Sequence, residues 1–154
     1  MEKRRERLQR YRSLAPLAVI ILGLGLLLTQ CPANRDGMPG QLANSMDETV
    51  TAARSGALAL DLWIQQRSTN QLTSVQLTDA RDEVVKAYKG IADLRGEDPV
   101  DIGRQRMLTE AMTSIVGQLN AAAGTIRHIT ADPAPDKARD DLRASADALE
   151  SGYR

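Results

Sequence analysis

The sequence predicts an all-α protein in which an N-terminal transmembrane helix precedes a small antiparallel bundle of three to four helices. A long uncharged, mostly apolar run follows a basic start, as in a membrane-spanning helix. Further along the chain, apolar residues recur every three or four positions, which is the spacing of one helix face. We therefore expect a basic cytoplasmic N-terminus at residues 1–12, a transmembrane anchor or signal segment at 13–33, a spacer at 34–44 and an extracytoplasmic bundle at 45–154.

The N-terminal segment predicts both membrane attachment and orientation. Residues 14–28 are apolar, and with their uncharged neighbours from 13 to 33 they reach the ~20 residues that cross a bilayer core. Six of the first 12 residues are Lys or Arg, whereas only Arg35 lies close behind the run. Because basic flanks stay in the cytoplasm, we expect a single-pass protein of the cytoplasmic membrane with its N-terminus inside and the bulk of the chain outside.

Cys31 leaves the fate of this segment open. Leu28, Thr29, Gln30 and Cys31 together resemble the lipobox of bacterial lipoproteins, which implies lipidation of Cys31. Gln30 stands where that motif has Gly, Ala or Ser, and this departure favours a retained anchor. A conventional cleaved signal peptide is the third alternative.

Composition limits the class of protein and its partners. A chain of 154 residues allows one domain, and its single cysteine allows neither an intramolecular disulfide nor a cysteine metal cluster. The chain lacks Phe, so we expect a core of Ala, Leu, Ile, Val and Met. Residues 13–154 carry 14 basic and 18 acidic side chains, and this net charge of −4 predicts no binding to nucleic acid.

Two apolar stripes predict the first two helices of the bundle. The first helix is expected to begin at a capping box, with Ser45 as cap and Glu48 three residues on, and to end near residues 68–70. Its stripe contains Met46, Val50, Ala53, Ala57, Leu60 and Ile64. The second helix is expected to stop near Gly96. Its stripe contains Leu77, Ala80, Val84, Ala87, Ile91 and Leu94.

The third helix has the longest stripe. Asp98 is its expected cap, and Pro99 takes the first helical position. The stripe contains Leu108, Met112, Ile115, Leu119, Ala122, Ile126 and Ile129. Gly103, Gly117 and Gly124 interrupt this segment, and two of them lie beside the stripe, where they would permit close approach of another helix.

A proline-rich break at residues 132–136 separates the fourth helix, which we expect Asp136 to cap. Its stripe contains Ala138, Leu142, Ala146 and Leu149. Because this stripe holds few large side chains, we expect the fourth helix to be the least stable element of the bundle.

The sequence contains no arrangement of residues typical of an active site. His128 is the only histidine, and no second histidine or cysteine pair accompanies it as a metal ligand, so we interpret it as a residue of a helix C-terminus. Carboxylates gather at residues 79–83 and 97–101, where we expect a solvated face and a helix start. We therefore predict that the protein is not an enzyme and has no catalytic, cofactor-binding or metal-binding residue.

One stretch of the first helix is apolar nearly all round. Residues 56–64 contain a single charge, Asp61, and Leu58, Leu62 and Trp63 lie off the stripe. A central helix that touches two or more neighbours would show this pattern. The alternative is that Leu58, Leu62 and Trp63 form a docking patch for a protein partner or a small apolar ligand, with Asp61 as a lone charge within or beside it.

These features favour a non-enzymatic, membrane-tethered helical module that acts by protein–protein interaction at the cell envelope. Its partners would be membrane lipid at residues 13–33 and a protein partner or a second copy of the chain. A small-ligand-binding or sensory bundle is an alternative, and the topology also resembles that of a phage spanin. In its basic start, apolar segment and Cys31, the chain resembles small helical lipoproteins and single-span proteins of the envelope of high-GC Gram-positive bacteria. That resemblance implies an envelope location.

Overall fold

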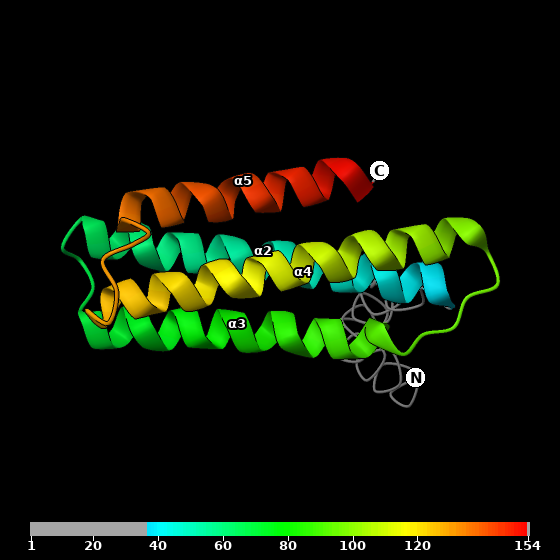
Figure 1. The fold of residues 1–154 in the computed structure, drawn as a ribbon, viewed down its shortest axis with the longest axis horizontal. Coiled ribbons are helices and arrows are strands. Elements are labelled where there is room, and N and C mark those ends of the chain that lie inside the picture. The colour runs from blue at the N-terminus through cyan, green and yellow to red at the C-terminus, as the bar shows by residue number, and fades with distance from the viewer. Residues whose placement is uncertain (1–36, 154) are drawn as a thin grey trace, which may run out of the picture. The chain divides into compact units, whose positions relative to one another are not determined.

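The computed structural model describes residues 37–153, which form four α-helices and contain no strand. These helices are α2 (Met38–Ile64), α3 (Asn70–Ala92), α4 (Pro99–Ile126) and α5 (Pro135–Tyr153). Consecutive helices run in opposite directions (Figure 1). The predicted all-α class and the helical bundle are therefore confirmed.

The anchor expected at residues 13–33, Cys31 and the basic segment at 1–12 all lie outside the described residues. Within residues 37–153, no helix combines the length and the apolar character needed to cross a membrane.

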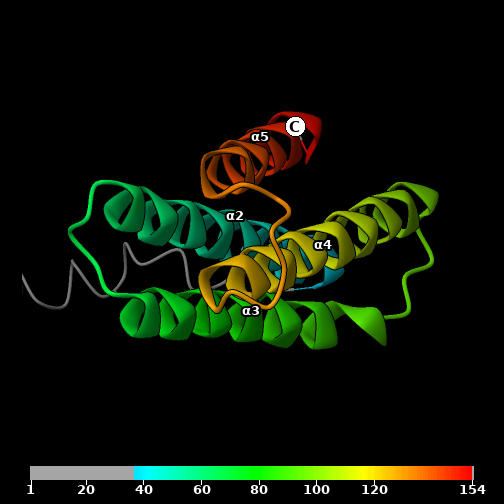
Figure 2. The same cartoon turned by 60° about the vertical axis from the view of Figure 1, so that its left-hand side comes forward.

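Helices α2 and α4 form the centre of the bundle. Each of them contacts the three other helices, whereas α3 and α5 make no contact with each other. In Figure 2, α3 lies on one side of the α2–α4 pair and α5 on the other. The cross-section therefore consists of two triangles that share the α2–α4 edge, and α2 has a boundary with α3 on one side and with α5 on the other.

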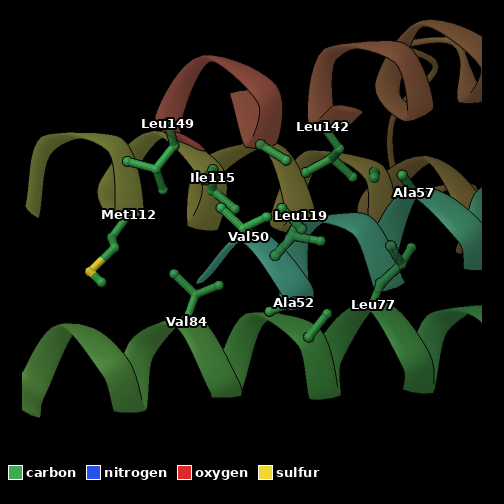
Figure 3. Packing of buried hydrophobic residues seen from close by; sticks show 14 of the residues in the cluster. Val50, Ala52, Ala57, Leu77, Val84, Met112, Ile115, Leu119, Leu142 and Leu149 are labelled. Atoms are coloured by element: carbon green, nitrogen blue, oxygen red, sulfur yellow. The ribbon is translucent and has the colours of Figure 1, made fainter. Parts of the chain in front are cut away.

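The predicted stripes meet in a single core. Side chains from all four helices converge there, as Figure 3 shows for Leu77 and Val84 of α3 and Leu142 and Leu149 of α5. The large side chains that are almost fully buried are Leu42, Leu60, Leu77, Ile91, Leu108, Met112, Ile115, Leu119, Ile126 and Leu142. The predicted core composition is confirmed, because Ala, Leu, Ile, Val and Met supply every apolar member of this cluster.

The start of the first bundle helix differs from the prediction. α2 begins at Met38, inside the expected spacer at 34–44, and Ser45 is a buried interior residue instead of the cap. Gly37 occupies the capping position with φ 89, a conformation that suits glycine, and a proline follows in the first turn. The glycine and proline that predict a spacer thus start a helix, and the fully buried Leu42 holds the added turns against the core.

The ends of α2 and α3 come earlier than predicted, at Ile64 instead of near residues 68–70 and at Ala92 instead of near Gly96. Asp98 caps α4 as predicted, accepting a hydrogen bond from the Val100 backbone N–H at 2.8 Å. Asp136 is not the cap of α5, because the helix begins one residue earlier and Asp136 lies in its first turn. Ile64 and Ile129 are 36% and 73% exposed instead of buried, since one is the last residue of α2 and the other lies beyond the end of α4.

Gly56 of α2 is packed against side chains of three other helices, whereas the glycines of α4 are not. A methyl group placed on Gly56 would lie 2.5 Å from Leu119 Cδ2, and 3.6 Å from a methyl carbon of both Leu142 and Leu77. These three leucines come from α4, α5 and α3, so all neighbours of α2 converge on this glycine. By contrast, Gly117 faces open space, which corrects the role predicted for the α4 glycines.

Candidate interaction groove

The structure divides the predicted patch on α2 into two parts. Leu58 is 55% exposed and Leu62 is half-buried, and both line a groove between α2 and α3. Trp63 is half-buried and lines a different hollow, at the end of α2 near the start of α5. The central position of α2 accounts for most of the apolar stretch, as predicted, but Leu58 and Leu62 remain on an open surface.

The groove, called here the α2–α3 groove, consists of two adjoining hollows of about 310 and 360 Å³ that share Glu83. The residues that line it are Asp47, Glu48, Thr51, Ser55, Leu58, Ala59 and Leu62 of α2, and Gln76, Asp79, Ala80, Glu83 and Lys86 of α3. Ala59 and Ala80 are buried, and these small side chains let the two helices approach closely. The groove is therefore shallow, with an alanine floor and partly exposed leucines along the α2 side.

Acidic side chains dominate the polar lining of the groove. Asp47 and Glu48 come from α2, Asp79 and Glu83 come from α3, and Lys86 is the one cation among the lining residues. All four carboxylates are exposed, and none has a hydrogen bond or ion pair with another side chain within residues 37–153. The solvated acidic face predicted at 79–83 is thus one wall of this groove.

An unpaired hydrogen-bond acceptor lies in the same groove. Gln76 lines the hollow beside Leu58 and Leu62, and its Oε1 atom is buried without a hydrogen-bond partner in the described part of the chain. A buried polar atom without a partner lowers stability, because it has lost its hydrogen bonds to water.

The opposite boundary of α2, with α5, carries paired charges. Arg54 of α2 places its Nη2 atom 2.9 Å from Asp147 Oδ1 and 2.7 Å from Glu150 Oε2 of α5. The hydrogen bonds to Asp147 and then Glu150 raise the pKa of the Arg54 guanidinium. One guanidinium group of α2 therefore pairs with two carboxylates of α5.

Asp61 shows the reverse arrangement on the same boundary. Its carboxylate lies 3.2 Å from Arg139 Nη1 and 3.9 Å from Arg143 Nη2, both on α5, and accepts a hydrogen bond from Gln65 Nε2 at 2.9 Å. A hydrogen bond to Asp140, followed by the one to Asp61, raises the pKa of Arg139. Asp61 is thus paired across the interface, which corrects its expected role as a lone charge.

His128 belongs to a polar contact at one end of the bundle. The indole N–H of Trp63 donates to Asn70 Oδ1 at 2.7 Å, and the Asn70 amide nitrogen lies 3.1 Å from His128 Nε2. His128 is exposed and follows the last turn of α4, which agrees with its interpretation as a helix C-terminal residue. Across residues 37–153, no group of three or more His, Cys, Asp or Glu side chains is placed to hold a metal ion.

The α2–α3 groove has the chemistry of a binding surface. Its leucines provide apolar contact area, and its unpaired carboxylates favour ligands of one charge sign. The sequence predicted Leu58 and Leu62 but not Gln76 or its place beside them, although Gln76, Asp79 and Glu83 follow one another at helical spacing beside the α3 stripe. No family model, curated protein or solved structure matches this chain.

Proposed function

We propose that this protein is a non-enzymatic, membrane-tethered helical module that acts by protein–protein contact at the cell envelope, and that its α2–α3 groove binds a helix of a partner protein. The observation that carries the proposal is the groove itself, with partly exposed leucines and four carboxylates that no described side chain pairs. A helix laid in an apolar groove is a common mode of recognition between proteins.

The dimensions of the groove favour a helical partner. Its lining residues on α2 extend from 47 to 62, which corresponds to about 22 Å along the helix axis. A partner helix of about four turns would match this length. A small molecule would keep much of its surface in water in so shallow a groove, whereas small-molecule sites bury about 70–90% of their ligand.

The proposed tether is the segment at residues 13–33, with the bundle on the outer side of the cytoplasmic membrane. The basic residues before this segment and its uncharged character support the proposal. The intact mass of membrane-extracted protein tests it, because a full-length anchor, a lipidated Cys31 and a cleaved form have different masses. A soluble, cleaved form as the sole product would overturn the proposed anchor.

Photo-cross-linking in cells tests the docking surface with the full-length protein. A photoreactive amino acid replaces Ser55, which is exposed and lines the groove, and in the control it replaces Ser114, which is exposed on α4. We expect one discrete protein adduct from position 55 and none from position 114. Adding Leu58→Arg should abolish the adduct, since it removes apolar contact and introduces a charge. Equal adducts at both positions, or none at position 55, would contradict the proposal.

A further inference from the structure

We infer that the helix bound in the α2–α3 groove is cationic and amphipathic. Its apolar face would contact Leu58 and Leu62, and its Lys or Arg side chains would pair with Asp79 and Glu83. This inference rests on the proposed docking function and adds to it the chemistry of the partner.

The first argument for a cationic partner is the negative charge of the groove. Four carboxylates and one ammonium group line it, and both of its walls are acidic, with Asp47 and Glu48 on α2 and Asp79 and Glu83 on α3. A partner that covers the groove removes water from these carboxylates. A cationic partner replaces that water with ion pairs, whereas an acidic or uncharged one leaves them desolvated and unpaired.

The second argument for a cationic partner is that the groove carboxylates have no ion-pair partner within the described residues. Some charges on other surfaces of the bundle are paired within the fold, such as Arg54 with Asp147 and Glu150, and Asp82 with Arg81 at 2.6 Å. The four groove carboxylates have no such pair within residues 37–153. Their full charge is therefore available to an external cation.

The third argument for a cationic partner is the spacing of Asp79 and Glu83 on α3. Asp79 and Glu83 are four residues apart on α3, so they lie on one side of the helix about 6 Å from each other. Basic residues three or four positions apart on a partner helix match this distance.

Peptide binding to the full-length protein in uncharged nanodiscs tests the inference. Three labelled helical peptides share one length and one leucine face and differ only in the opposite face, which carries Lys and Arg, Glu, or Gln and Ser. By fluorescence anisotropy we expect the cationic peptide to bind at least about tenfold more tightly than the uncharged one and the acidic peptide to bind least. Empty nanodiscs report binding to the membrane alone.

Salt and charge variants give two further readouts. The affinity of the cationic peptide should fall at least about fivefold between roughly 0.05 and 0.5 M salt. It should fall at least about tenfold in the double variant Asp79→Asn, Glu83→Gln. The matched control, Asp93→Asn with Glu110→Gln, removes two exposed acids outside the groove and should leave the affinity unchanged. All four positions are exposed, so these changes spare the core.

The outcomes separate this inference from the proposed function. Equal binding of all three peptides, lost in Leu58→Arg, would overturn the cationic partner and leave helix docking intact. Tightest binding of the acidic peptide, or an equal loss in the control double variant, would also overturn it. A cross-linked adduct with the mass of two copies of this chain would identify a second copy as the occupant and overturn a separate cationic partner. No peptide binding together with no adduct at position 55 would overturn both proposals.

Discussion

The two sides of α2 differ in whether their charged side chains are paired. Toward α5, Arg54 meets two acids and Asp61 meets two arginines, so each charge of α2 has partners of the other sign. Toward α3, acids of both helices line one groove and none of them is paired within the described residues. The charges at the α2–α5 boundary are neutralised within the fold, whereas the carboxylates at the α2–α3 boundary remain exposed to solvent.

This difference shows how the bundle separates stabilising charges from available ones. Complementary charges on α2 and α5 attract each other and help a helix with few large apolar residues to stay in place. Like charges on α2 and α3 repel each other, so that boundary depends on apolar packing, including Ala59 and Ala80. Unpaired charges along a closely packed boundary therefore mark the surface on which to seek a partner.

The largest expected effect tests whether α5 is held by its core contacts. Leu142→Ala should lower the free energy of unfolding by about 2–5 kcal/mol, because Leu142 is fully buried beside Leu119 and Gly56. Denaturation of the full-length protein by urea measures this change. Leu58→Ala, on the groove, should change stability by less than about 0.5 kcal/mol. A loss at Leu58 as large as that at Leu142 would contradict the open groove.

A smaller effect tests the point at which α2 meets its three neighbours. Gly56→Ala should destabilise the protein by about 1–3 kcal/mol, because the new methyl group would overlap the fully buried Leu119. Gly117→Ala is the matched control, since open space surrounds Gly117, and it should stabilise α4 by about 1 kcal/mol through helix propensity. Thermal unfolding of both variants measures the two shifts, and equal shifts would contradict the close approach at Gly56.

The smallest effect compares a paired carboxylate with an unpaired one. Asp61→Asn should lower stability by about 1 kcal/mol, because Asp61 and Arg139 are each less than a quarter exposed and lose an ion pair. Asp79→Asn should be neutral or slightly stabilising, since it removes an unpaired acid that lies one helical turn from Glu83. The loss at Asp61 should shrink at high salt. An equal loss in both variants would remove the distinction between the two boundaries.

Much of the fold could be predicted because burial leaves a periodic signal along a helix. The stripes of the second and fourth helices are buried at every position except Leu94, which lies past the end of α3 and still packs against the core. The errors lie at helix ends. α2 begins at Met38, before the cap that the sequence suggests, whereas the apolar stripes of α2 and α4 continue to Ile64 and Ile129, at or beyond the last helical residue. End positions depend on the local backbone and on what the last turn contacts.

Only the α2 side of the groove could be predicted from the sequence. Leu58 and Leu62 stand out because they depart from their own stripe, but their partner wall on α3 cannot be found in the same way. In the sequence, α3 has the pattern of an ordinary solvent-exposed helix face at Gln76, Asp79 and Glu83. Their place opposite Leu58 depends on the register between α2 and α3, and neither helix encodes that register alone.

The apolar periodicity of the sequence predicted the helices of the bundle and most of the residues that fill its core, because each helix must bury one apolar face and that face recurs along the chain. Which helices became neighbours followed from how they pack together. By placing α5 against Arg54 and Asp61, and α3 against Asp47 and Glu48, the packing paired one set of charges and left the other free. Charge pairing depends on distances across helices, and those distances exist only once the helices have packed.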